Sequence, residues 1–313
     1  MHLIPRPKSV INHEGEFFIE RDTEIILSSE LSFEDLNLAI MIQEEIEKVL
    51  DLKLNINKLF MDKKYSNSII LRECKFENEE EYKIEIKENK AIIEGSGAGL
   101  FYGCQSFRQL VREFGACIPN LTIEDSPYFK YRGFYHDVTR GMVPTLDTLK
   151  SLVDKAAFYK INQLQLYIEH TFAFKGMSEV WMDKDPLTAE EILILDKYCK
   201  ERHVELVPSL STFGHLYEAL RSKSFRELCE LEIGDEEYSF VDRMAHHTLD
   251  VTNPKSLDFV ESMLLEFIPL FSSDKFNICC DETFDLGKGK SREKAEKLGV
   301  GKIYTEFLNK VYN

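Results

Sequence analysis

From residue 130 onward, short apolar runs alternate regularly with amphipathic helical segments. This alternation predicts parallel βαβ units, because a chain that returns to the same edge of a sheet needs a crossover helix. A complete (β/α)8 barrel takes about 250 residues. Residues 130–313 therefore predict about four units, half of a TIM barrel, unless the sheet is open and the barrel comparison fails. The expected strands are 133–138, 163–168, 204–210 and 276–280, and the expected helices are 145–160, 188–202, 254–271 and 303–312.

Residues 1–127 have a different sequence pattern, in which β-rich runs and helical stretches follow one another in mixed order. The glycine-rich turn at 95–99 lacks the Gly-Lys-Ser/Thr of a phosphate-binding loop, so we expect a tight turn before a packed helix. Asp125-Ser-Pro-Tyr128 marks a linker, because the residue before a proline favours an extended backbone. We predict an α/β protein with a non-catalytic α+β domain at 1–127 and a truncated barrel domain at 128–313. The expected N-terminal strands are 17–19, 23–27, 68–71, 82–86 and 91–94, and the helices are 35–50 and 100–113.

Charge and cysteine content exclude several classes of function. With 55 acidic against 39 basic residues the formal net charge is −16, so nucleic acids and anionic membrane surfaces are repelled. No apolar stretch reaches the roughly 18 residues of a membrane span, and the N-terminus has no apolar signal core. Seven cysteines at irregular spacing indicate reduced thiols rather than disulfides. We expect a cytoplasmic protein without nucleic-acid or membrane partners.

Polar residues, many of them ionisable, lie at or just past the end of every expected strand of the second region. In parallel α/β sheets the functional site forms at the carboxyl ends of the strands, so these residues are expected on one rim. A single carboxylate there is most often a helix cap, but four such strand ends in succession favour a functional rim. The residues are His136, Asp137 and Arg140 after the first strand, Glu169 and His170 after the second, Ser209, Ser211, Thr212 and His215 after the third, and Asp281 and Glu282 after the fourth.

The adjacent acids Asp281 and Glu282 are the most informative of these residues. Two close carboxyl groups push their pKa values apart, which lets one be protonated while the other is ionised. Glycoside hydrolysis has this requirement, because an acid protonates the leaving oxygen and a second group stabilises the positively charged sugar. An Asp-Glu dipeptide alone is common, and two solvated or capping acids are the alternative interpretation.

Four sequence motifs resemble, in order and spacing, the glycoside hydrolase family 20 β-N-acetylhexosaminidases. They are Tyr131-Arg-Gly-Phe-Tyr-His-Asp-Val-Thr-Arg140, the helix end Tyr159-Lys-Ile-Asn162, the run 206–215 that ends in Thr-Phe-Gly-His, and Cys280-Asp-Glu-Thr283. Gly99-Leu-Phe-Tyr-Gly103 resembles the end of the non-catalytic domain that precedes the barrel in that family. The resemblance extends over essentially the whole sequence.

The resemblance implies removal of a terminal β-linked GlcNAc or GalNAc from an oligosaccharide or glycoconjugate. In the implied mechanism, the 2-acetamido oxygen of the sugar attacks its own anomeric carbon, so no enzyme nucleophile is needed. Glu282 would protonate the glycosidic oxygen and later activate water, while Asp281 would hold the acetamido N–H and stabilise the oxazolinium. Arg132 would bind the hydroxyls at C3 and C4, and His215 would steady the carboxylates. No metal or organic cofactor is implied.

The sequence departs from the family pattern in two places. The second strand ends in Tyr167-Ile-Glu-His-Thr171 where many members have His-Leu-x-Asp-Asp, so Glu169 and His170 are substrate-binding candidates by position. The family closes its acetamido pocket with tryptophans and a tyrosine from later strands. The single tryptophan here, Trp181, lies in the loop after the second strand, as a loop anchor or a contact for a neighbouring sugar.

Two other functions stay open at this level. One is a glycan-binding fragment that keeps the rim but performs no turnover. The other is a metal-dependent hydrolase, because strand-end histidines and aspartates also bind zinc, although no His-x-His or His-Glu-x-x-His motif supports it. The exposed edges of a half barrel also predict self-association. The candidate metal ligands are His136, Asp137, His170, His215 and Asp281.

Overall fold

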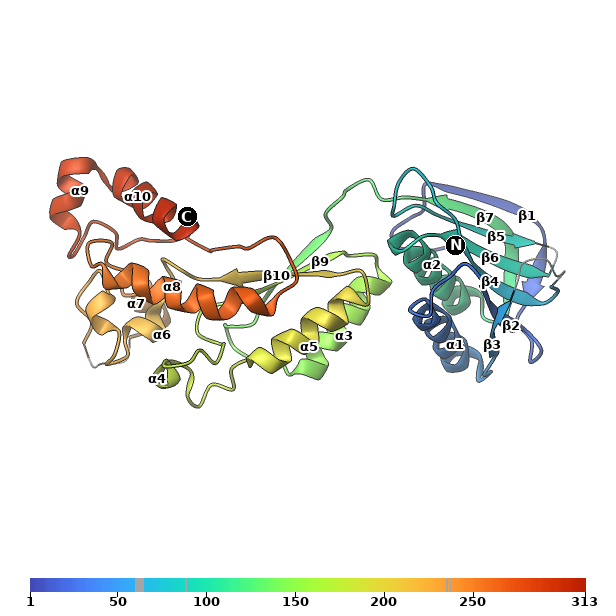
Figure 1. The fold of residues 1–313 in the computed structure, drawn as a ribbon, viewed down its shortest axis with the longest axis horizontal. Coiled ribbons are helices and arrows are strands. Elements are labelled where there is room, and N and C mark those ends of the chain that lie inside the picture. The colour runs from blue at the N-terminus through green and yellow to red at the C-terminus, as the bar shows by residue number, and fades with distance from the viewer. Residues whose placement is uncertain (60–64, 88, 235, 237) are drawn as a thin grey trace. The chain divides into compact units, whose positions relative to one another are not determined.

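The computed structural model describes residues 1–59, 65–87, 89–234, 236 and 238–313 (Figure 1). The chain divides into two compact units, Met1–Arg132 with Asp154–Asn162, and Gly133–Val153 with Gln163–Asn313. Among the helices of the described residues, none combines the length and apolarity needed to cross a bilayer.

The first unit is a seven-stranded mixed sheet with two helices against one face (Figure 1). The strand order is β1-β7-β5-β6-β4-β2-β3, with β2, β3, β4 and β6 joined in parallel and β5 antiparallel to both of its neighbours. Edge strand β1 pairs antiparallel with β7. The bounds are β1 Ser9–Phe18, β2 Glu24–Ser28, α1 Leu36–Leu50, β3 Asn55–Leu59, β4 Ser68–Glu73, β5 Tyr82–Lys87, β6 Lys90–Gly95, α2 Ala98–Phe114 and β7 Cys117–Asp125.

Helix α2 approaches the sheet closely because it begins with glycines. A Cβ atom at Gly99 would lie 2.2 Å from the carbonyl oxygen of Glu81, and one at Gly103 would lie 2.7 Å from Cγ2 of Ile93. Neither position has room for a side chain. The turn and helix expected at 95–113 are therefore present, and the glycines serve packing.

Two buried charges in this unit are paired. Glu45 on α1 is 2% exposed and accepts hydrogen bonds from Arg112 at 2.7 Å and Arg108 at 3.1 Å, which joins α1 to α2. The Lys160 ammonium lies 3.3 Å from Asp125, and burial lowers its pKa to about 8 against the opposing effect of Asp125. Loss of Asp125 would leave the buried Lys160 ammonium without its carboxylate, and loss of both arginines would leave the buried Glu45 uncompensated, so these ion pairs are structural.

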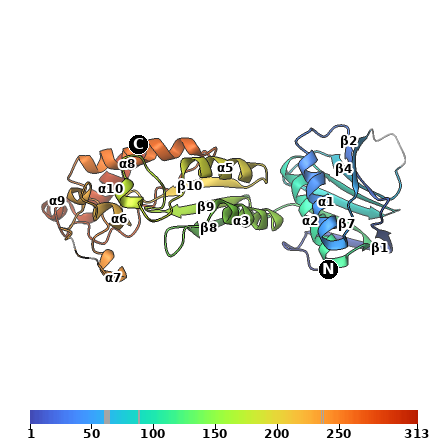
Figure 2. The same ribbon diagram turned by 90° about the horizontal axis from the view of Figure 1, so that it is seen from below.

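The second unit contains a three-stranded parallel sheet in the order β10-β9-β8. Strand β9 is central, with Asp137 opposite Tyr167 on one side and Leu210 opposite Ile168 on the other. Long helices α3, α5 and α8 alternate with these strands, as expected (Figure 2). The bounds are β8 Gly133–Asp137, α3 Leu146–Phe158, β9 Gln163–Ile168, α4 Ser178–Trp181, α5 Ala189–Lys200, β10 Glu205–Leu210, α6 Tyr217–Leu220, α7 Phe240–Arg243, α8 Lys255–Phe267, α9 Arg292–Leu298 and α10 Val300–Tyr312.

The boundaries of these helices have local causes. Thr188 caps α5 by accepting a hydrogen bond from the Glu191 N–H, while the Glu191 carboxylate accepts one from the Thr188 N–H. Helix α8 ends at Phe267 and continues as a 3₁₀ turn, Ile268–Leu270, because Pro269 cannot donate within an α-helix. The helix expected at 254–271 is thus shorter.

The prediction of a fourth strand at 276–280 is wrong. Within the described residues this segment contributes one isolated bridge, between Ser209 and Asn277. Hydrogen bonds of 2.9 Å from Asn277 N to Pro208 O and of 3.0 Å from Leu210 N to Asn277 O hold it beside β10. Cys279 then has φ +40°, which no regular strand contains, and its N–H donates to the Asn277 side chain.

Candidate active site

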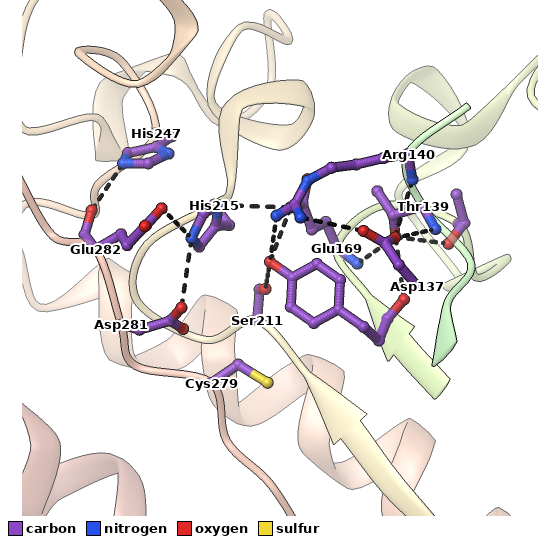
Figure 3. A network of polar contacts seen from close by, with 12 residues as sticks. Asp137, Thr139, Arg140, Glu169, Ser211, His215, His247, Cys279, Asp281 and Glu282 are labelled. Carbon is purple, nitrogen blue, oxygen red and sulfur yellow. Dashed lines mark hydrogen bonds and ion pairs between the residues drawn. The ribbon is translucent and has the colours of Figure 1, made fainter. Parts of the chain in front are cut away.

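The carboxyl ends of β8, β9 and β10 and the segment after the Asn277 bridge surround a cavity of about 540 Å³ (Figure 3). Parallel strands bring their carboxyl ends to one edge of the sheet, which is why residues far apart in sequence meet here. The lining residues are Tyr135, Asp137, Arg140, Tyr167, His215, Asn277, Cys279, Cys280, Asp281 and Glu282.

Asp281 and Glu282 reach the cavity because the backbone turns sharply beside them. Glu282 has φ +51°, a left-handed conformation that non-glycine residues seldom adopt. The loop after β10 passes so close that a Cβ atom on Gly214 would lie 2.4 Å from the Asp281 carbonyl oxygen. Both acidic side chains remain accessible, at 63% and 46% exposure for Asp281 and Glu282.

The imidazole of His215 connects the acidic groups of the site. Its Nε2 lies 3.1 Å from Oε2 of Glu282 and 3.6 Å from Oδ2 of Asp281, while its Nδ1 lies 3.5 Å from Oε1 of Glu169 (Figure 3). The ring also packs edge-on against Tyr167, at a centroid distance of 6.1 Å. Both ring nitrogens therefore face carboxylates, and the ring fixes the positions of these carboxylates relative to one another.

Arg140 is the cation that lines the cavity. Its guanidinium lies 3.1 Å from Asp137 and 3.2 Å from Glu169, and it stacks over the ring of Tyr167 at 5.1 Å. Burial opposes its charge, but the carboxylate of Glu169 leaves the pKa of Arg140 raised overall. The side chain is 48% exposed, so N–H donors remain available to a ligand.

Glu169 is the most buried of the three carboxylates near His215. Burial raises its pKa, although a 2.8 Å hydrogen bond from the Tyr167 hydroxyl, His215 and Arg140 oppose the shift. Its backbone N–H donates to the Thr139 hydroxyl at 3.0 Å, which ties the end of β9 to the loop after β8. Glu169 therefore contacts both Arg140 and His215 and helps to fix their orientation.

Three neutral groups near Asp281 form a hydrogen-bonded cluster. The Tyr135 hydroxyl lies 2.7 Å from Oγ of Ser209 and 3.3 Å from Sγ of Cys279, and the latter two atoms are 3.0 Å apart. Burial raises the pKa of both the Cys279 thiol and the Tyr135 phenol. The cluster is thus an uncharged wall beside Asp281 and not a nucleophile.

Comparison with known proteins identifies the family. Residues 1–126 match the model of glycosyl hydrolase family 20, domain 2, and residues 129–299 match that of the glycosyl hydrolase family 20 catalytic domain. This chain belongs to glycosyl hydrolase family 20. A beta-hexosaminidase of Vibrio furnissii is 24% identical over 98% of this chain and 52% of that protein. The beta-hexosaminidase subunit beta of Mus musculus is 28% identical over 44% of this chain and 28% of its own length.

Solved structures of the family share the fold. A chitobiase of Flavobacterium johnsoniae superposes with a TM-score of 0.81 at 20% identity, over 99% of this chain and 50% of that one. The N-acetyl-β-hexosaminidase of Streptomyces plicatus gives 0.78 at 23% identity, over 97% and 64%. The chain thus spans between about half and two thirds of these proteins, which agrees with a partial barrel in the second unit.

Arg132 does not lie in the cavity of this family 20 chain. It precedes β8, at the amino end of the strand, and its guanidinium donates to Glu80 at 2.8 Å and to the Tyr102 hydroxyl at 3.0 Å. Its Nε also donates to the carbonyl of Lys160 at 2.7 Å. The donors expected to bind sugar hydroxyls are thus engaged within the first unit, and the expectation for Arg132 is corrected. Arg140, at the carboxyl end of the same strand, has the required position.

His170 is also absent from the cavity lining. Burial lowers its pKa to about 4, and the charges that act on it come from Lys184, Glu218 and Arg243 rather than from Asp281 or Glu282. Its buried Nδ1 has no hydrogen-bond partner in the part of the chain that the structure describes. Strand alternation explains the difference, because successive side chains leave a strand in opposite directions and Glu169 takes the inward one.

The candidate metal ligands do not converge. His136 stacks on Phe134, His170 faces another cluster, and within the described residues no group of three or more histidines, cysteines or acids is arranged to hold a metal ion. Trp181 donates its indole N–H to the carbonyl of Phe174 at 2.9 Å, so it fastens its own loop.

Sequence reasoning missed several residues of the site. Tyr135 and Tyr167 lie two positions before Asp137 and Glu169, so the period-two rule for strands predicts that each pair shares a face. His247 is 3% exposed and its Nε2 lies 2.9 Å from the Glu282 carbonyl oxygen. Nothing in the local sequence of His247 signals this contact, because it depends on a long connection after β10.

Proposed function

We propose that this family 20 chain carries the catalytic carboxylates of an exo-acting β-N-acetylhexosaminidase. The substrate is a glycan or glycoconjugate with a terminal β-linked N-acetylhexosamine. The observation that carries the proposal is the arrangement of Asp281 and Glu282 around His215 Nε2, at 3.6 and 3.1 Å, on the wall of a cavity large enough for one sugar. The beta-hexosaminidase names of the relatives support it.

In the proposed reaction the substrate supplies its own nucleophile. Glu282 donates a proton to the glycosidic oxygen while the 2-acetamido oxygen attacks the anomeric carbon and the bond to the aglycone breaks. Asp281 remains ionised, accepts the acetamido N–H and stabilises the oxazolinium. Glu282 then removes a proton from the water that opens this intermediate, with retention at the anomeric carbon. Arg140, held by Asp137 and Glu169, donates to the hydroxyls of the sugar.

Hydrolysis of a chromogenic aryl β-N-acetylglucosaminide by the 313-residue chain tests the proposal. Glu282→Gln keeps the shape of the acid but removes its proton, and we expect it to lower kcat about 10²- to 10⁴-fold. Glu293→Gln, an exposed substitution on α9, is the matched control. Sugar binding without turnover in a folded sample would instead identify a glycan-binding fragment, and loss of activity on chelation would identify a metal-dependent hydrolase.

We further propose that the chain associates with itself through the sheet of the second unit. Within the described residues β8 pairs with β9 alone, and Phe134 and Tyr135 on this strand are 41% and 48% exposed. An unpaired edge with exposed aromatic side chains favours pairing with another strand. Sedimentation velocity of the wild type and of Phe134→Lys tests this, since a monomer at all concentrations would contradict it.

A further inference from the structure

His247 contacts the backbone of the segment that carries Asp281 and Glu282. It follows α7 in a long connection and is 3% exposed, with its Nε2 2.9 Å from the backbone oxygen of Glu282 (Figure 3). A carbonyl oxygen can only accept, so Nε2 must carry the hydrogen. This contact therefore defines the tautomer of the ring.

The Glu282 carbonyl is a point where the backbone must be fixed. Glu282 has φ +51°, and its carbonyl oxygen also accepts a 2.8 Å hydrogen bond from the N–H of Phe284. The His247 ring stacks parallel to that of Phe284, with 16° between the planes and 6.2 Å between centroids. The left-handed turn is thus held by a side chain from a distant segment as well as by its own tight hydrogen bond.

The same residue is tied to the loop that carries His215. The Leu216 N–H donates to the carbonyl of His247 at 3.0 Å, and the two imidazoles meet at a centroid distance of 4.9 Å. Burial lowers the pKa of His247, and His215 contributes in the same direction, which favours a neutral ring with one N–H. His247 thus joins, through its backbone and its ring, the two segments that present His215 and Glu282.

We propose that His247 is a positioning residue, which holds the backbone of Glu282 in the left-handed turn from which its carboxyl group reaches His215 and the cavity. This inference rests on the proposed function, because it concerns the acid of that reaction. His247 is not among the residues that line the cavity. Its effect belongs to the step in which Glu282 transfers a proton.

Two substitutions separate the hydrogen bond from the volume of the ring. His247→Leu removes the donor, and His247→Gln places an N–H at about the reach of Nε2. We expect the leucine variant to lower kcat about 10- to 100-fold with KM within about 2-fold, because small displacements of catalytic groups are costly. The glutamine variant should recover to within about 3-fold of the wild type. Equal losses in both variants, or an unchanged kcat in the leucine variant, would overturn the proposal.

A neighbouring histidine supplies the control. His246 packs on Tyr238 at a centroid distance of 4.3 Å, and its buried Nδ1 has no hydrogen-bond partner among the described residues, so His246→Leu should change the melting temperature rather than kcat. A loss of kcat in His246→Leu equal to that in His247→Leu would mean that the whole connection, and not the hydrogen bond, matters. That result would also overturn the proposal.

Nuclear magnetic resonance keeps the test independent of turnover. In a sample labelled with ¹⁵N-histidine and ¹³C-carbonyl, we expect a slowly exchanging Nε2–H proton for His247 and a scalar coupling across the hydrogen bond to the Glu282 carbonyl carbon. If the wild type shows no turnover but this coupling is present, the proposed function fails while the hydrogen bond stands. A His247 ring protonated at Nδ1 alone would overturn the inference whatever the activity.

Discussion

The imidazole of His215 lies 3.1 Å from the carboxylate of Glu282, measured from Nε2 to Oε2. His215 lies in the loop after β10, and Glu282 lies in the segment after the Asn277 bridge. His215 itself has φ +59°, so the loop after β10 bends sharply to present the ring. On its far side the ring faces Glu169 at 3.5 Å. The acid of the proposed reaction is therefore oriented by a ring that a third carboxyl group holds in turn.

Replacement of His215 by asparagine should separate orientation from folding. Asparagine tolerates the left-handed backbone but is too short to reach both Glu169 and Glu282. We expect kcat for the aryl substrate to fall about 10- to 100-fold, because the carboxyl group of Glu282 is no longer oriented. Steady-state kinetics and a melting curve are the measurements. A variant that melts like the wild type and retains its kcat would rule out the orienting role.

Asp281 and Glu282 should be distinguishable by the leaving group of the substrate. Asp281→Asn removes the negative charge proposed to stabilise the oxazolinium, so kcat should fall about 10²- to 10³-fold for good and poor leaving groups alike. Glu282→Gln should lower kcat most for substrates with poor leaving groups, since these leaving groups need the proton that Glu282 donates. The Asp281 side chain is 63% exposed, so Asp281→Asn should change the free energy of unfolding of the chain by less than about 0.5 kcal/mol. Identical leaving-group dependence in the two variants would contradict the assigned roles.

The alternation of helices and strands in the second unit was predictable because both periodicities are local. The three paired strands and the long helices α3, α5, α8 and α10 lie where the pattern places them. The run 276–280 has the apolar character of a strand, but its course depends on the turns at Cys279 and Glu282. In the first unit, β3 and β7 escaped prediction, and the expected strand 17–19 covers only the end of β1, which lies at the edge of the sheet and pairs with β7 from the far end of that unit.

The site was predictable only where strand direction decides it. The rule that sites form at carboxyl ends selects Asp281, Glu282, His215 and Glu169, and it would also have favoured Arg140 over Arg132. The sequence motif around β8 contains both arginines, and it does not reveal that Arg132 pairs with Glu80, which lies in a distant segment. His170 differs from expectation and His247 was not predicted at all, for a related reason, because their surroundings come from loops that are distant in sequence.

Substitutions of the two arginines that flank β8 should therefore affect different properties, substrate binding for Arg140 and stability for Arg132. Arg140→Met removes donors from the cavity, and we expect KM to rise about tenfold or more with little change in stability, since the side chain is 48% exposed. Arg132→Met removes the arginine that pairs with Glu80 and should lower the free energy of unfolding by about 1–3 kcal/mol, with KM unchanged. Kinetics and urea unfolding of both variants check this pair. A rise in KM for Arg132→Met alone would restore the original expectation for Arg132.

His170 should make the stability of the chain depend on pH. Its folded-state pKa is lowered to about 4 by burial, with Lys184 and Arg243 acting in the same direction and Glu218 opposing, whereas the unfolded value is about 6.5. Between these values the unfolded chain binds the proton and the folded chain does not. The contribution of His170 to stability is therefore fully present above pH 6.5 and is lost as pH falls toward 4, by about 2–3 kcal/mol at pH 4.5.

Urea unfolding at pH 7 and pH 4.5 tests this dependence. His170→Gln should reduce the difference in the free energy of unfolding between the two pH values, whereas His13→Gln, at an exposed site, should leave it unchanged. Parallel profiles for the wild type and His170→Gln would show that His170 is not the group that titrates.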